Sequence, residues 1–98
     1  MITLKLMPDY HCYPLWGVDD DNWGNIDPHS LPISAMLADD LIQWANEYDN
    51  TLNMEDPLNS GFKNKEEELS FKNKGENLLK RLEAELGNNY SVFLKIVL

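Results

Sequence analysis

Hydrophobic residues alternate with polar ones at both ends of the chain, which is the period of a half-buried β-strand. The first alternation covers residues 2–6 and ends at Pro8. The last covers residues 91–98 and is richer in β-branched residues, so we place this strand beside the first, at the centre of the sheet. Between them, the strand-like piece Tyr13–Val18 contains Pro14, which cannot donate to a sheet ladder and confines the piece to an edge.

The middle of the chain repeats its apolar residues at helical spacing. A helix is predicted after Pro32, with Ser34 as the N-cap residue whose hydroxyl accepts from the first free amides. One continuous apolar stripe follows, formed by Leu37, Leu41, Trp44, Tyr48 and Leu52. Asp56-Pro57 stops this helix, and residues 59–61 form a loop.

A second helix is predicted from Asn64, because Glu67 follows three residues later at capping-box spacing. Gly75 falls on its apolar stripe and permits close approach of a neighbouring element, and Gly87 begins a left-handed stop. The order strand, edge strand, helix, helix, strand predicts an α+β fold. We expect one domain over residues 1–98, with a small antiparallel sheet and both helices packed on one face.

Charge is distributed unevenly along the chain. Residues 1–60 carry eleven carboxylates against one lysine, Lys5, whereas residues 61–98 carry six against seven basic residues, for a net charge of −9. A concentrated negative surface attracts a basic partner over about 8 Å at physiological salt and repels the phosphates of nucleic acid. We therefore expect a basic protein partner and no nucleic acid, with acidity for solubility alone as the plain alternative.

Several protein classes are disfavoured by size and composition. Cys12 is the only cysteine, which is typical of a reducing cytosol. The N-terminal sequence lacks the features of a secretory signal, and no apolar run approaches the roughly 18–20 residues that span a bilayer. The chain has room for a shallow surface site, but hardly for a deep pocket with a cofactor domain. We expect a cytoplasmic, non-catalytic protein without cofactor or membrane contact, as a monomer or weak dimer.

Residues 19–30 carry part of a calcium-loop pattern, with acids at the first and third positions and glycine at the sixth. Trp23 replaces the oxygen ligand at the fifth position, and Ser30 replaces the bidentate glutamate at the twelfth. An exposed acidic loop is therefore the better interpretation. Cys12 and the two histidines lack a fourth zinc ligand, and no third group orients Cys12 as a nucleophile.

The acidic segment contains the best candidates for contact with a partner. Trp23 lies among aspartates with no periodic reason to point inward, and a large aromatic ringed by charge resembles a binding hot spot. Trp16 either shares that role or closes one end of the sheet. Together with aspartates of the first helix, the loop would form one continuous acidic patch. The predicted contact residues are Asp19, Asp20, Asp21, Trp23, Asp39 and Asp40.

Residues spread over nearly the whole chain resemble a known family. They are the string from Asp9 to Trp16, Leu31-Pro32-Ile33-Ser34, the first helical stripe, Asp56-Pro57, Ser60-Gly61-Phe62, Gly75 and Glu85-Leu86-Gly87 before Tyr90. The chain is similar to small acidic bacterial immunity proteins of contact-dependent growth inhibition and related polymorphic toxin systems. This resemblance implies a cytoplasmic, non-catalytic antidote that binds the C-terminal domain of one cognate toxin, often a nuclease with a basic cleft.

The charge pattern and the resemblance together predict an immunity protein that neutralises a basic nuclease through an acidic surface. Two alternatives stay open at this stage. One is an acidic binding module for another basic protein, either an anti-activator or a mimic of nucleic acid. The other is a metal-binding or hydrolytic protein that uses Asp19, Asp21, Asp27, His11 or His29.

Overall fold

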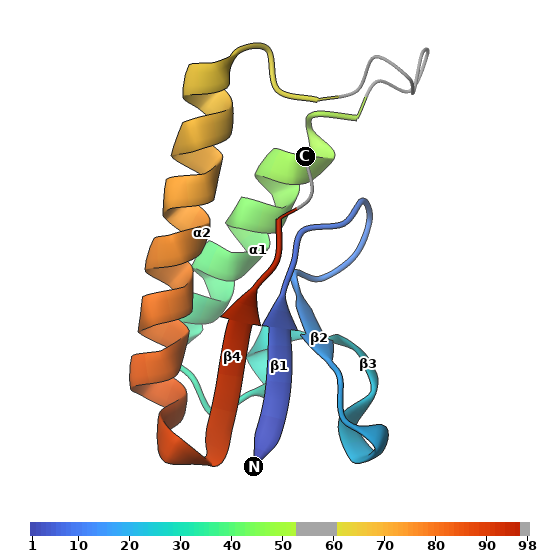
Figure 1. Cartoon of the computed structure of the whole chain (residues 1–98), viewed down its shortest axis with the longest axis vertical. Helices are drawn as coiled ribbons and strands as arrows, with labels where there is room; N and C mark the ends of the chain where they lie inside the picture. The colour runs from blue at the N-terminus through green and yellow to red at the C-terminus, as the bar shows by residue number, and fades with distance from the viewer. Residues whose placement is uncertain (53–60, 97–98) are drawn as a thin grey trace.

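The computed structural model describes residues 1–52 and 61–96, which form a sheet with two helices against it (Figure 1). The strands are β1 (Ile2–Leu6), β2 (Leu15–Gly17), β3 (Gly24–Ile26) and β4 (Tyr90–Leu94). The helices are α1 (Ala35–Asp49) and α2 (Lys65–Leu86). Short 3-10 turns connect other elements: η1 (Asp20–Asn22) lies between β2 and β3, η2 (Pro28–Ser30) between β3 and α1, and η4 (Gly87–Asn89) between α2 and β4. This arrangement confirms the predicted α+β class.

The sheet is mixed, in the order β3-β2-β1-β4, so the prediction of an antiparallel sheet was wrong for one pair of strands. β2 pairs antiparallel with both β1 and β3, whereas β4 pairs parallel with β1. The reason is that α2 returns the chain to the end of the molecule where β1 begins, so β4 runs in the direction of β1 (Figure 1). β4 does lie beside β1, as predicted, but at the edge of the sheet and not at its centre.

The predicted edge strand is also displaced. β2 lies inside the sheet, because Pro14 precedes the strand and serves only as an acceptor, from the amide of Met7 at 2.9 Å. Its outer side is covered by β3, a strand of three residues that the turn-rich sequence did not reveal. Proline lacks a backbone N–H, but at position 14, just before the strand, no N–H has to donate to a neighbouring strand. Pro14 therefore does not prevent β2 from pairing on both sides.

Both helices begin where the sequence predicts. The Ser34 hydroxyl accepts from the amide of Leu37 at 3.2 Å, and the side chain of Asn64 accepts from the amide of Glu67 at 2.9 Å. The C-terminal stop of α2 also agrees, since Gly87 has φ +74°. The first helix ends at Asp49, before the predicted stripe residue Leu52. Asp56-Pro57 and residues 59 and 60 lie outside the described residues.

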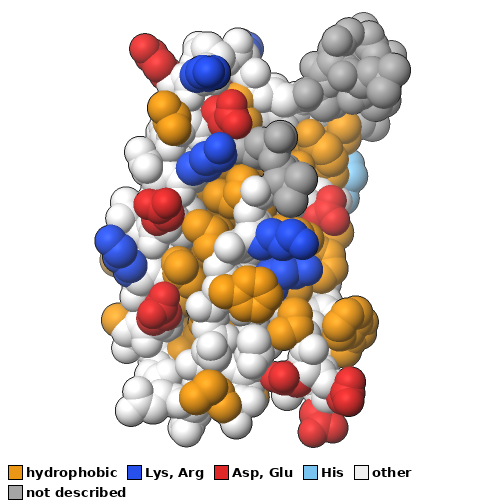
Figure 2. Space-filling model, viewed as in Figure 1, with side chains coloured by type: hydrophobic (Ala, Val, Ile, Leu, Met, Phe, Trp, Pro, Cys, Tyr) orange, Lys and Arg blue, Asp and Glu red, His pale blue; other side chains and the backbone are white. Residues whose placement is uncertain are grey.

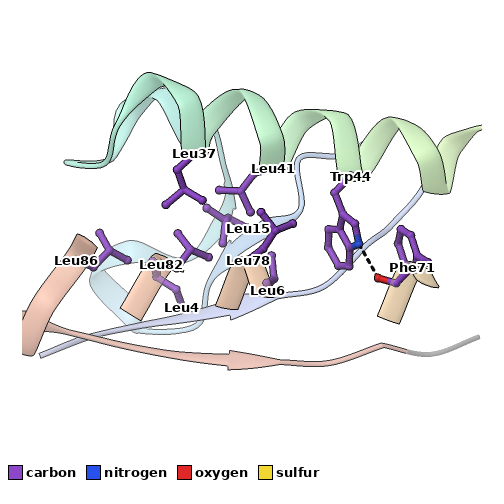
Figure 3. Close-up of a cluster of buried hydrophobic side chains, with 10 residues drawn as sticks. All are labelled: Leu4, Leu6, Leu15, Leu37, Leu41, Trp44, Phe71, Leu78, Leu82 and Leu86. Carbon is purple, nitrogen blue, oxygen red and sulfur yellow. Dashed lines mark hydrogen bonds between the residues drawn. The ribbon is translucent and has the colours of Figure 1, made fainter. Parts of the chain in front are cut away.

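The core lies between the helices and one face of the sheet (Figure 3). It consists of Leu4, Leu6, Leu15, Leu37, Leu41, Trp44, Phe71, Leu78, Leu82 and Leu86. Trp44 stacks on Phe71 with ring centroids 4.6 Å apart and donates its Nε1–H to the Phe71 carbonyl at 3.0 Å. A side chain at Gly75 would crowd this ring, since a Cβ atom would lie 2.8 Å from Trp44 Cζ2. The close approach predicted at Gly75 is therefore present. No helix of the described residues lies on the opposite face of the sheet (Figure 1).

Candidate functional site

Most carboxylates of the front half have a partner inside the protein. Glu55 and Asp56 lie outside the described residues, which leaves nine of the eleven in residues 1–60. Seven of these nine make hydrogen bonds or ion pairs: Asp9 with the Tyr10 amide, Asp19 with the Thr3 amide, Asp27 with the His29 amide, Asp39 with the His29 ring, Asp40 with Arg81, Glu47 with Lys74 and Asp49 with the His11 amide. Within the described part of the chain, Asp20 and Asp21 alone of the nine have no such partner.

These two residues belong to the acidic turn, which we define as Asp19–Trp23, between β2 and β3. Both are exposed, and Trp23 is 79% exposed. Figure 2 shows acidic side chains gathered over this turn at the lower right of the molecule. The turn thus presents two unpaired carboxylates and a large aromatic side chain to solvent.

Asp19 and Gly17 hold the acidic turn against the sheet. Asp19 Oδ2 accepts from the amide of Thr3 in β1 at 2.6 Å, so its carboxylate ties the turn to the neighbouring strand. Gly17 lies directly beneath the turn, where a Cβ atom would overlap the carbonyl oxygen of Asn22. Asp19 therefore positions the turn, while Asp20 and Asp21 project from it.

Asp39 and Asp40 lie elsewhere, on the first part of α1. Asp39 pairs with His29 Nε2 at 3.1 Å, and Asp40 pairs with Arg81 of α2 at 2.8 Å. The turn η2, not the acidic turn, packs against α1. Extended residues 23–27 separate the two turns, a span on the order of 15 Å at about 3.3 Å per residue. Four of the six predicted contact residues thus share one turn, and the two of α1 form a separate group.

The side of the sheet that faces away from the helices is a second candidate for the functional surface. Leu4, Leu6 and Leu15 point to the core, so their neighbours along the strands point the other way. We call this surface the open face; its residues are Thr3, Lys5, Trp16, Asn25, Ser91 and Phe93. Figure 2 shows hydrophobic and basic side chains over these strands, beside the acidic ones of the turn.

One row of the open face crosses all four strands. Lys5 pairs in register with Trp16 on one side and Phe93 on the other, and Trp16 pairs with Asn25. Trp16 Nε1 donates to the Met7 carbonyl at 3.0 Å, and Lys5 Nζ lies 5.8 Å from the centre of the Trp16 ring. Phe93 is 43% exposed. The hydrogen bond and the contact with Lys5 hold the Trp16 indole in place on the open face.

The structure gives little support to the chemical alternatives. Within residues 1–52 and 61–96, no three His, Cys, Asp or Glu side chains lie close enough to hold a metal ion. Residues 19–30 fold as two 3-10 turns around β3, with the Asp19 carboxylate bound to a backbone amide. Burial, followed by the charges of Asp9 and Asp49, raises the pKa of the Cys12 thiol. A raised pKa keeps a thiol in its protonated form, which is less nucleophilic than the thiolate.

Burial also raises the pKa of Tyr48, which stacks on Tyr10 with ring centroids 4.5 Å apart. This pair joins the loop after β1 to the end of α1. No helix among the described residues is long and apolar enough to cross a bilayer.

A charged turn beside an uncovered face with rigid aromatic residues has the composition of a protein-binding surface, with apolar anchors and a polar rim. The family model described as Serratia CdiI immunity protein-like matches residues 2–95. The chain belongs to this family, which confirms the resemblance to immunity proteins of contact-dependent growth inhibition. No curated protein matches the chain significantly.

Sequence reasoning identified the acidic turn but missed the open face. In the sequence, Lys5 stands out as the single lysine of residues 1–60, and Phe93 is one position of the alternating run 91–98. The row that they share depends on the register of β1 with β4. The alternation itself was the usable signal, because it places Lys5 and Trp16 opposite the core. The order of the elements already predicted both helices on one face of the sheet, which leaves the opposite face uncovered. The register that aligns Lys5 with Trp16 and Phe93 became visible only in the structure.

Proposed function

We propose that this protein binds a cognate toxin domain and neutralises it without catalysis, using the acidic turn as the docking point for a basic surface of the toxin. A nuclease cleft is the best fit, because a site that holds phosphates also accepts closely spaced carboxylates. Family membership supports the toxin as the partner.

The observation that carries the proposal is the distribution of partners among the carboxylates. Asp20 and Asp21 project without partners from a turn that Asp19 anchors, while the other described front-half carboxylates serve the fold. Unpaired charges at a fixed position lose little conformational freedom on binding, and they retain their full attraction for a cationic partner.

Within this proposal the six predicted residues have different roles. Asp20, Asp21 and Trp23 contact the toxin, and Asp19 positions them. Asp39 and Asp40 pair with His29 and Arg81 and belong to a separate part of the surface. Charge pairs that become desolvated in the complex each contribute a few kcal/mol of coupling, whereas pairs at the rim mainly speed association.

Co-expression tests the function directly. We expect cells that produce the toxin domain encoded beside this chain to grow when this chain is also produced, and to stop growing with an empty plasmid. The purified chain should also bind that toxin domain in a one-to-one complex. Growth no better than with the empty plasmid would contradict the proposal. A pull-down that instead recovers an unrelated DNA-binding protein would favour the acidic binding module.

A further inference from the structure

We propose that the open face, with Lys5, Trp16 and Phe93 at its centre, is the main contact surface for the toxin domain, and that the acidic turn is its rim. This inference rests on the proposed function. It specifies the matching surface of the toxin: an apolar centre, an acidic group opposite Lys5 and basic groups opposite Asp20 and Asp21.

The first argument is the apolar, rigid character of the centre. Trp16 is held by its hydrogen bond to the Met7 carbonyl, and Phe93 lies on the neighbouring side of Lys5. Tryptophan is enriched among the residues that dominate interface energies, and a side chain that is already held in place loses little entropy on binding. Phe93 adds a second aromatic side chain that is 43% exposed.

The second argument concerns charge. Lys5 is the only lysine or arginine in the first 60 residues, yet it lies in the middle of this face over the Trp16 ring. Among the described residues no carboxylate pairs with Lys5 or with Lys95, which continues the alternation of β4 on the same side. Lys5 and Lys95 thus place two positive charges on the face, and the acidic turn places two carboxylates at its rim. This pattern favours a partner with negative charge opposite the lysines and positive charge opposite the carboxylates.

The third argument is area. Strands of five residues at about 3.3 Å per residue, spaced about 4.8 Å apart, outline a face of only a few hundred Å². A specific interface needs about 800 Å² from each partner. Neither the open face nor the acidic turn reaches this area alone. The two adjoin at one end of the sheet, so together they form the larger continuous surface that a stable complex requires (Figure 2).

A second copy of this chain fits the surface poorly. In a symmetric dimer centred on the open face, Lys5 near the axis would meet Lys5 of the other copy. The two copies, each with a net charge of −9, would also repel one another. A partner of different sequence and opposite charge avoids both costs.

The experiment compares dissociation constants for the toxin domain, with its nuclease or other lethal activity removed by substitution, measured by calorimetry. We expect Phe93→Ala and Lys5→Ala each to weaken binding at least about tenfold, the loss typical of interface anchors. Lys5→Glu should weaken it further. The matched controls are Leu69→Ala and Lys80→Ala, exposed positions on α2, and these should bind like the wild type. Thermal unfolding of each variant verifies that it is folded.

The outcomes separate this inference from the proposed function. If the wild type binds and the variants of the open face bind equally well, the inference is overturned while the function stands. If Lys5→Glu binds more tightly than the wild type, no acidic group opposes Lys5 and the inference is again overturned. If the wild type itself does not bind, the proposed function fails. A chain that sediments alone as a dimer, and as a monomer after Phe93→Ala, would make the open face a self-interface and contradict the inference.

Discussion

Gly17 and Gly75 are positions where neighbouring atoms come so close that a Cβ atom would not fit without displacing them. Gly75 was expected from its place on an apolar helical stripe, because a glycine there implies close approach. Gly17 was not, since nothing in residues 13–18 indicates that the chain folds back over the end of β2. Local periodicity reveals which side of an element is buried, but not which loop returns to cover it.

Gly17→Ala should displace the acidic turn. The added methyl group overlaps the backbone of Asn22, which cannot rotate away as a side chain would. We expect a loss of about 1–3 kcal/mol in the free energy of unfolding, measured with urea, together with weaker toxin binding. Ser70→Ala, at an exposed position of α2 outside the open face, is the control and should change stability and affinity little. Unaltered stability and affinity in Gly17→Ala would show that the turn is not held as described.

Gly75→Ala sets two effects of opposite sign against one another. Alanine gains about 1 kcal/mol in helix propensity, but its methyl group crowds the buried Trp44 ring. Because that ring is also hydrogen-bonded and stacked, overpacking of about 1–3 kcal/mol should win, and the variant should be less stable. The smaller ring of Trp44→Phe relieves the crowding, so the same Gly75→Ala change should cost less in that background. Equal costs in both backgrounds would contradict the contact.

The helices were the most predictable elements, and the reason is chemical. Caps and stripes depend on residues only three or four apart, so Ser34, Asn64 and Gly87 identify the ends of α1 and α2 without knowledge of the rest of the chain. Strand pairing joins residues far apart in sequence. The parallel direction of β4 beside β1, and the pairing of β3 with β2, therefore became visible only in the structure.

Ser34→Ala should destabilise the protein more than an ordinary cap substitution. Besides capping α1, Ser34 joins its start to the end of α2, because its amide and hydroxyl donate to the Glu85 carboxylate at 2.6 and 3.0 Å. We expect a loss of at least about 1 kcal/mol by urea unfolding. Ser70→Ala, at an exposed position inside α2, provides the comparison and should be neutral or slightly stabilising. A loss in Ser34→Ala no larger than that in Ser70→Ala would argue against this junction.

At the scale of the whole molecule, the uneven charge of the sequence overstates the number of carboxylates that are unpaired among the described residues. From the sequence, eleven carboxylates in residues 1–60 suggest a broad acidic patch. In the structure, ion pairs such as Asp40–Arg81 and Glu47–Lys74 join α1 to α2, and at partial exposure each contributes about 1 kcal/mol or less. Composition cannot distinguish a carboxylate that bonds to a backbone amide or a basic side chain within the protein from one that is left unpaired.

Association with the toxin should depend on ionic strength. The net charge of −9 and the unpaired carboxylates of the acidic turn attract a basic domain before contact, and added salt screens this attraction. We expect the association rate constant to fall at least about tenfold between roughly 0.02 and 0.5 M salt in stopped-flow measurements, with a smaller change in the dissociation rate. A flat association rate would mean that the acidic turn does not guide docking.

The affinity of an Asp20→Asn, Asp21→Asn double variant for the toxin domain is the most direct test of the account. Its control is Glu76→Gln, Glu83→Gln, which removes the same charge from exposed positions of α2. The account predicts at least a tenfold loss of affinity in the first variant and nearly wild-type affinity in the second, by calorimetry at physiological salt. Equal losses, or no loss in either variant, would contradict the acidic turn as the docking point.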